Sequence, residues 1–178
     1  MRIIAGTAKG RRIAAPPSGT RPMTGRARES LFSILGDRIE GADVLDLYAG
    51  SGSLGLEALS RGAASATFVE RSRKASRIIA ENIAAVGLGG TVVTASAATA
   101  IERTDARFDV IFIDPPYRDA DGEVAALVGA LERVLADRGL VVVHRQSSSR
   151  ISVPEFLTCT DERRYGDAVV TMMERPAT

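Results

Sequence analysis

Continuous apolar runs alternate with segments of helical periodicity through most of this chain. Such runs are typical of strands that are buried on both faces of a sheet. They predict strands at residues 44–48, 66–70, 92–95, 108–114 and 140–144. Apolar residues at helical spacing predict helices at residues 54–61, 72–86 and 121–135. This order indicates an α/β fold, a doubly wound, Rossmann-like parallel sheet with helices on both faces.

Residues at the predicted helix ends agree with this assignment. Ser72 and Asp121 are predicted N-caps, because their short polar side chains can accept hydrogen bonds from the first turn of a helix. Gly87 and Gly139 are the residues at which these two helices are expected to end. A further helix is predicted to begin after Thr24, another N-cap residue.

The N-terminus departs from the alternating pattern. Short β-type runs at residues 2–5 and 11–14 predict a β-hairpin with Lys9 at its tip. Prolines and a glycine at residues 16–19 then predict a linker. We therefore expect a small hairpin extension at residues 1–20.

The C-terminus also lacks the strand and helix alternation. Strand-like residues 156–160 and 168–173, joined around Gly166, predict an antiparallel hairpin at the edge of the sheet. A chain of 178 residues with 45% hydrophobic residues is long enough for one ordinary core. The main domain is therefore expected to occupy residues 21–178.

Composition excludes several kinds of site. Cys159 is the only cysteine and His144 the only histidine, so the chain cannot form an internal disulfide and a metal centre is not expected. The N-terminus lacks the apolar stretch of a signal peptide, and no run approaches the roughly 20 apolar residues of a membrane span. We expect a soluble, cytoplasmic protein.

Charge is distributed unevenly along the chain. The first 28 residues hold seven basic residues and no acid, whereas the remainder holds 16 basic residues against 22 acids. The basic residues of this arm are Arg2, Lys9, Arg11, Arg12, Arg21, Arg26 and Arg28. A basic arm on an acidic body suggests contact with a polyanion, and Arg2, Lys9, Arg11 and Arg12 are the predicted phosphate contacts. A solvated terminus without a partner is the alternative.

A glycine-rich loop follows the strand at residues 44–48. Its glycines, Gly50, Gly52 and Gly55, fit the G-x-G-x-x-G pattern of dinucleotide sites, with Glu70 at the end of the next strand. Asp46 favours a different cofactor, because a carboxylate would repel a pyrophosphate and attract the sulfonium of S-adenosylmethionine. We expect Gly50 and Gly52 to lie against that cofactor, Gly55 to allow close helix packing, and Glu70 to bind the ribose hydroxyls.

The strand at residues 108–114 ends in Asp114, Pro115, Pro116 and Tyr117, at the sheet edge that carries the glycine loop. Prolines make a stiff turn that presents carbonyls without competing N–H donors. Asp114 and the Pro115 carbonyl are predicted to accept both N–H groups of an exocyclic amine, and Tyr117 to stack on the base. Such a base must be single-stranded or flipped out of a helix. The alternative is a simple turn after a buried strand.

These segments together resemble the bacterial ribosomal RNA small-subunit methyltransferase D family. The matching pieces are MRIIAGTAKGRR, TRPMTGRARESLFSIL, VLDLYAGSGSLGLEALSRGA, FVER and IFIDPPY. The resemblance implies a seven-stranded methyltransferase sheet, an RNA-gripping N-terminal hairpin, and methylation of a guanine N2 in 16S rRNA. It also implies S-adenosylmethionine as the methyl donor, a small-subunit particle as the partner, and a monomeric enzyme without a metal or a membrane.

The resemblance assigns further residues to the site. The segment with Arg21, Pro22, Thr24 and Arg26 corresponds to a part that closes over the cofactor. Arg26 or Arg28 is expected to meet the cofactor carboxylate or an RNA phosphate. Because the acid that often follows the third strand is missing, Ser96 and the backbone around Ala97 are expected to bind the adenine.

His144 stands where the family commonly has an acid, and it is either a catalytic base or, as we favour, a solvated histidine at a strand end.

Three other functions stay open at this point. The D-P-P-Y turn would equally serve a DNA adenine or cytosine amino methyltransferase. The glycine loop alone would suit a nicotinamide-dependent oxidoreductase. The basic arm alone would suit a non-catalytic RNA-binding or ribosome-assembly protein.

Overall fold

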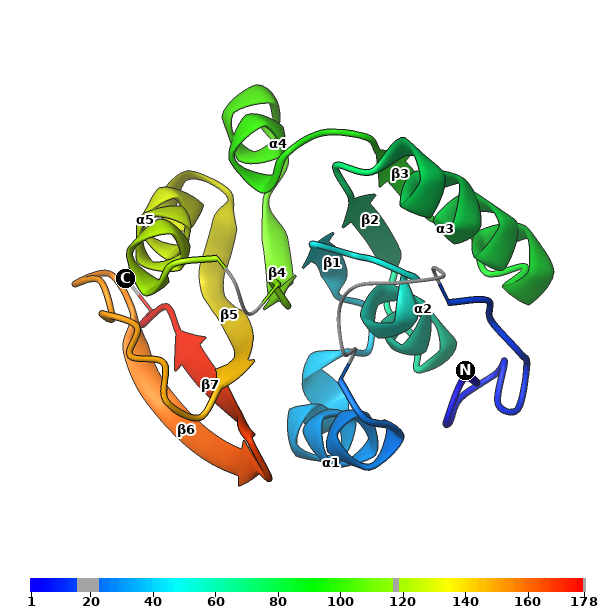
Figure 1. Ribbon diagram of the computed structural model, residues 1–178, viewed down its shortest axis with the longest axis horizontal. Helices are drawn as coiled ribbons and strands as arrows, with labels where there is room; N and C mark the ends of the chain where they lie inside the picture. Colours follow the sequence, from blue (N-terminus) through cyan, green and yellow to red (C-terminus); the bar gives the residue numbers. More distant parts are fainter. Residues whose placement is uncertain (16–22, 117–118, 178) are drawn as a thin grey trace.

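A computed structural model describes residues 1–15, 23–116 and 119–177 of the chain, and it contains one seven-stranded mixed sheet (Figure 1). The strands are β1 (Asp43–Leu47), β2 (Ser65–Val69), β3 (Thr91–Val93), β4 (Phe108–Ile113), β5 (Leu135–Gln146), β6 (Thr158–Tyr165) and β7 (Ala168–Glu174). Their order is β3-β2-β1-β4-β5-β7-β6, and β7 runs antiparallel to both of its neighbours. The predicted doubly wound sheet and its antiparallel C-terminal hairpin are confirmed.

The helices are α1 (Gly25–Leu35), α2 (Ser53–Ser60), α3 (Arg73–Val86), α4 (Ala97–Arg103) and α5 (Asp121–Ala130). Two predicted N-caps are confirmed, because the side chains of Thr24 and Ser72 accept hydrogen bonds from the first turns of α1 and α3. Gly87 ends α3 in the left-handed conformation, as expected. Among the described helices, none is long and apolar enough to cross a bilayer.

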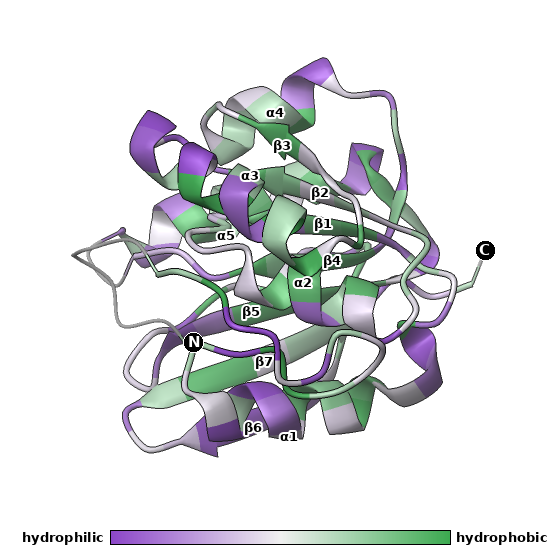
Figure 2. Cartoon of the chain, turned by 90° about the vertical axis from the view of Figure 1, so that its right-hand side faces the viewer, coloured by the Kyte–Doolittle hydropathy of each residue, from purple (hydrophilic) through white to green (hydrophobic). Residues whose placement is uncertain are grey.

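Two apolar layers enclose the sheet, one on each face. Strand side chains such as Phe68 and Phe112 pack with α1, α2 and α3 on one face. The alternate side chains, such as Ile111 and Ile113, pack with α4 and α5 on the other face. Because both faces are covered, the central strands carry apolar residues at nearly every position, as the hydropathy colouring in Figure 2 shows. This two-sided burial is the physical reason for the unbroken apolar runs.

The segments before and after β4 differ from the prediction in three ways. Asp121 is not the N-cap of α5, because Ala120 takes that place and the Asp121 carboxylate binds Arg145 and the Arg150 N–H instead. The helix also ends early, at Ala130, and passes through the 3₁₀ turn Leu131–Arg133 into β5. In addition, α4 forms between β3 and β4, where no helix was predicted.

The predicted N-terminal hairpin is not formed as a pair of strands. One isolated bridge joins Arg2 to Arg12, and turns connect the residues between them. The segment is nevertheless fixed to α2, since Glu57 accepts hydrogen bonds from the backbone of Ile4 and Ala5 at 2.7 and 3.0 Å. Side-chain anchoring to a helix therefore adds to the few backbone hydrogen bonds between the two arms of the segment. The predicted boundary at residue 20 lies outside the described residues.

The topology determines where a ligand can bind. After β1 the chain continues outward to β2 and β3, and it then returns to place β4 on the other side of β1. The carboxyl ends of β1 and β4 are in register, with Leu47 beside Ile113. This is the switch point of the sheet, outside which ligands bind in open α/β folds.

Candidate active site

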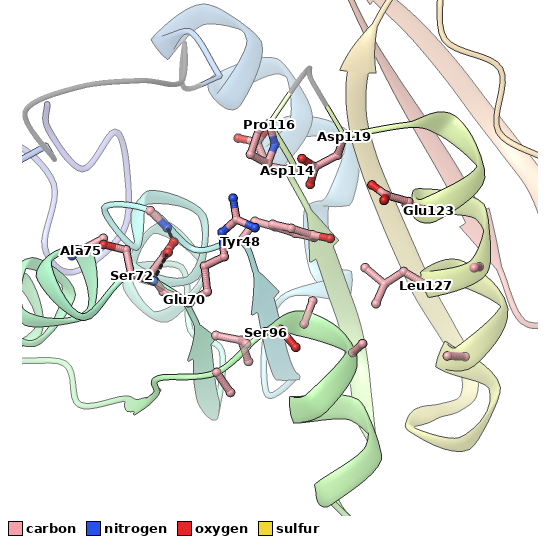
Figure 3. A pocket seen from close by; sticks show the side chains of 18 residues that line it. Tyr48, Glu70, Ser72, Ala75, Ser96, Asp114, Pro116, Asp119, Glu123 and Leu127 are labelled. Carbon is pink, nitrogen blue, oxygen red and sulfur yellow. Dashed lines mark hydrogen bonds between the residues drawn. The ribbon is translucent and has the colours of Figure 1, made fainter.

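A cavity of about 910 Å³ opens at this switch point (Figure 3). Its lining comes from the β1 and β2 ends, the first turns of α3 and α4, the turn after β4 and one face of α5. Of the residues predicted from the sequence, six line it: Gly50, Glu70, Ser96, Ala97, Asp114 and Pro116. The structure thus brings together residues that lie up to 66 positions apart in the sequence.

The glycine loop is built from close backbone contacts. Gly50 and Gly52 both have positive φ angles, of 58° and 76°, which glycine adopts without a steric penalty. A Cβ atom on Gly55 would lie 2.4 Å from the Phe68 ring, so glycine is needed there for α2 to approach β2. The predicted packing role of Gly55 is confirmed. Gly52 is buried against the same ring and does not line the cavity.

Asp46 is buried beneath the loop and is not among the residues that line the cavity. Its Oδ2 accepts a hydrogen bond from the Gly55 N–H at 2.9 Å, which ties the end of β1 to α2. Burial raises the pKa of this carboxyl to about 8, and the carboxyls of Asp114 and Glu70 contribute further. The group is therefore mostly neutral at pH 7, and its predicted role as a charge facing the cofactor has to be corrected.

The negative charge of the cavity comes from other residues. Four carboxyl side chains line it, those of Glu70, Asp114, Asp119 and Glu123, against a single basic residue, Arg71, in the described lining. An excess of acids opposes a pyrophosphate and favours a ligand that carries positive charge. The electrostatic preference that was assigned to Asp46 is thus present, but it is distributed around the cavity wall.

Glu70 joins the glycine loop to the start of α3. Its Oε2 accepts a hydrogen bond from the Gly50 N–H at 3.0 Å, and its Oε1 accepts one from the Ser72 N–H at 2.8 Å, drawn dashed in Figure 3. A carboxylate has about four acceptor positions, so both oxygens retain capacity for hydroxyl donors. Across the cavity, Ser96 caps α4 by accepting the Thr99 N–H, and Ala97 begins that helix.

Asp114 lines the cavity beside Pro116 and Asp119 (Figure 3). Its Oδ1 is 2.7 Å from Nδ1 of His144, which is only 4% exposed. The expectation of a solvated histidine at the strand end was therefore wrong, because the ring is buried and in hydrogen-bond contact with Asp114, at the end of the neighbouring strand β4. Pro115 is buried and follows Asp114 directly, whereas Tyr117 lies outside the described residues.

Sequence reasoning missed several residues of the cavity. The Tyr48 ring projects from the loop after β1 toward α5, as Figure 3 shows, and its φ of 60° is unusual for a residue other than glycine. Burial and nearby Asp119 raise the pKa of the Tyr48 hydroxyl. Glu123 and Leu127 line the cavity from one face of α5, and their helical spacing was the available signal.

The predicted basic contacts fall into two groups. Arg2, Lys9 and Arg12 are exposed, and Arg11 is exposed with one guanidinium N–H donated to the Val86 carbonyl at 2.6 Å. Arg28, in contrast, is 2% exposed and donates to the Arg2 carbonyl at 2.6 Å. Its predicted contact with RNA or cofactor is not compatible with this burial, which also lowers its pKa.

The predicted cofactor-closing segment is only partly described. Thr24 caps α1 and Arg26 is exposed on its first turn, but neither residue lines the cavity. Arg21 and Pro22 lie outside the described residues.

Comparison with known proteins gives a consistent result. A family described as Conserved hypothetical protein 95 matches residues 1–174. The protein is 36% identical over 182 residues to the Ribosomal RNA small subunit methyltransferase D of Escherichia coli (strain K12), covering 99% of this chain and 91% of that protein. It is 34% identical to the Putative rRNA methyltransferase YlbH of Bacillus subtilis (strain 168), with coverages of 98% and 92%.

A solved structure agrees with the sequence matches. The Putative methyltransferase yhhF from Escherichia coli superposes with a TM-score of 0.88 at 35% identity, covering 100% of this chain and 99% of that one. The sequence match and the fold match therefore both extend over nearly the whole chain. The chain therefore belongs to the ribosomal RNA small subunit methyltransferase D family.

Proposed function

We propose that this protein transfers the methyl group of S-adenosylmethionine to the exocyclic N2 of a guanine in 16S rRNA. Family membership makes it an S-adenosylmethionine-dependent ribosomal RNA methyltransferase. The proposal adds the target atom, the small-subunit particle as the substrate, and the roles of individual residues.

One observation carries the proposal: the acid-lined cavity opens directly beside a turn of hydrogen-bond acceptors. Its volume of about 910 Å³ is within the usual range for small-molecule sites. Glu70 is the candidate partner of the ribose hydroxyls, and Ser96 with the Ala97 backbone is the candidate adenine contact. The excess of carboxyls over basic side chains suits a sulfonium and an amino group, and it disfavours a nicotinamide dinucleotide.

When bound, S-adenosylmethionine supplies an electrophilic methyl group to this site. Asp114 and the Pro115 carbonyl would accept the two N–H groups of the guanine amine, which directs the nitrogen lone pair toward that methyl group. Attack by this nitrogen would form the N–C bond as the S–C bond breaks, leaving the electron pair on the sulfur of S-adenosylhomocysteine. The proton that the methylated amine must lose would pass to the Asp114 carboxylate that accepts it or to solvent. Tyr117 is proposed to stack on the base, as its place in the sequence suggests.

The exposed basic residues of the N-terminal segment are proposed to hold RNA phosphates. Glu57 and Ser60 of α2 fix the backbone of this segment, so Arg2, Lys9 and Arg12 project from a rigid support. These basic residues would bind the polyanion, while the carboxyls around the cavity would disfavour entry of phosphate into the methyl-transfer site.

A labelled-methyl assay tests the function. The protein would be incubated with labelled S-adenosylmethionine and either naked 16S rRNA, 30S particles or duplex DNA, and the products digested and identified by mass spectrometry. We expect N2-methylguanosine from the RNA, with faster transfer to the particle. Label found only in DNA, or on another position of the base, would overturn the proposal.

A further inference from the structure

Two adjacent residues at the end of β5 hold the turn after β4 from opposite faces of the sheet. Ile113 lies beside Val143 in the β4–β5 register, which places Asp114 next to His144. Successive side chains of a strand point to opposite faces. Accordingly, Val142 packs in the layer of α1 to α3, whereas Val143 packs in the layer of α4 and α5. His144 and Arg145 continue this alternation.

On one face, His144 holds the Asp114 side chain. The 2.7 Å contact joins Nδ1 of the ring to Oδ1 of the carboxyl, and the histidine is 4% exposed. An ionised carboxylate only accepts hydrogen bonds, so the ring nitrogen is the donor. Oδ1 is partly engaged in this way, so Oδ2, which accepts no hydrogen bond from the described residues, is the more available oxygen for a substrate amine.

On the other face, Arg145 holds the backbone of the same turn. Its Nη1 donates to the Pro116 carbonyl at 3.1 Å, and its Nη2 donates to the Asp119 carbonyl at 2.7 Å. Nη2 also meets Oδ1 of Asp121 at 3.0 Å. These three contacts span the turn from Pro116 to the first residue of α5. The Pro116 carbonyl also accepts the Asp119 N–H at 3.0 Å, so it is already engaged within the turn.

Burying the Arg145 side chain at this position costs free energy of desolvation. It is 3% exposed, and its Nε is buried with no hydrogen-bond partner among the described residues. A buried guanidinium loses its hydration, and apolar replacements of buried ion pairs are often neutral or stabilising. Stability alone therefore does not explain why an arginine lies here, whereas the fixed fork of donors explains the geometry of the turn.

We infer that His144 and Arg145 are the positioning residues of the methyl-transfer turn: His144 orients the Asp114 carboxylate, and Arg145 fixes the backbone that follows it. The inference rests on the proposed function of Asp114. Neither residue lines the cofactor cavity. Their loss should consequently slow methyl transfer and leave cofactor binding intact.

The test compares four variants in single-turnover methyl transfer to the RNA acceptor and in calorimetric binding of S-adenosylmethionine. We expect Arg145→Met and His144→Leu to lower the transfer rate about 10–100-fold, with the cofactor Kd within about threefold of wild type. His144→Asn keeps an N–H donor near the Nδ1 position and should restore most of the rate. Arg145→Lys keeps the charge but loses the fork, so it should stay slow.

Arg163→Met is the matched control, because Arg163 also pairs with a carboxylate, Asp161, but on the exposed strand β6. It should transfer at the wild-type rate. Wild-type rates in both Arg145→Met and His144→Leu, or a parallel fall of transfer rate, cofactor affinity and Tm in all four variants, would overturn the inference. If His144→Leu fails to fold, the transfer rates of the two Arg145 variants and of His144→Asn still test the inference. Absence of transfer by the wild type itself would count against the proposed function instead.

Discussion

The glycine loop after β1 and the turn after β4 lie at neighbouring strand ends, yet they are held in different ways. The loop is held through its backbone N–H groups, since Gly50 donates to Glu70 at the end of β2 and Gly55 donates to Asp46 of β1. The turn is fixed by His144 and Arg145, which come from the next strand in the sheet. The cofactor loop is thus held by acids that accept its N–H groups, whereas the reactive turn is held by side-chain donors from β5 that bind its acceptors.

The largest expected effect concerns the turn alone. Replacing Asp114 by Ala should lower the rate of methyl transfer by about 1000-fold, because the amine loses an acceptor that orients it. Cofactor affinity should change less than about threefold, as measured by calorimetry. Asp109→Ala, at the exposed start of the same strand, is the control and should keep the wild-type rate. Equal losses of rate and cofactor affinity in Asp114→Ala would erase the distinction between loop and turn.

The next effect concerns the carboxyl beneath the loop. Asp46 has a pKa of about 8 in the folded protein, raised from 3.8, so folding favours its protonated form. Its contribution to stability is complete below about pH 4 and is lost as the pH rises through about 8. Unfolding measured between pH 5 and 9 should show wild type losing stability relative to Asp46→Asn. A constant difference between the two proteins would contradict the raised pKa.

A steric substitution at Gly55 tests how closely α2 packs on β2 beside the same loop. Gly55→Ala should destabilise the fold by about 1–3 kcal/mol, because the new Cβ would lie 2.4 Å from the Phe68 ring. Gly129→Ala in α5 is the control, since its Cβ would meet open space and alanine favours a helix by up to about 1 kcal/mol. Urea unfolding of both variants gives the comparison. Similar stabilities would show that the helix–strand contact is not tight.

The smallest effect concerns the N-terminal segment. Lys9→Ala should weaken RNA binding by less than about tenfold and reduce the slope of log K against log salt by about 1, the loss of one phosphate contact. Arg164→Ala, an exposed change on β6 at the far edge of the sheet, should leave that slope unchanged. Filter-binding titrations over a range of salt concentrations would measure it. An unchanged slope for Lys9→Ala would remove this residue from the RNA surface.

Local chemistry accounts for what the sequence predicted well. Burial on both faces requires unbroken apolar strands, and glycine is required where φ is positive or a ring approaches closely, as at Gly50 and Gly55. Two helix N-caps were likewise visible, because Thr24 and Ser72 act within their own first turns. The α/β class, the glycine loop and the acceptor turn were therefore accessible from the chain alone.

Tertiary structure decided the charge and the partners of the site. The sequence predicted Asp46 as a charge that faces the cofactor, but burial favours its neutral form. The four carboxyls of the cavity wall come instead from the end of β2, the turn after β4 and α5. Asp121 was predicted to be a helix N-cap, but its carboxylate instead pairs with the guanidinium of Arg145 from β5. His144 was predicted to be solvated, but it is buried and in contact with Asp114 in the folded protein. Burial and long-range pairing depend on which strands become neighbours, and that is a property of the folded sheet, not of any local segment.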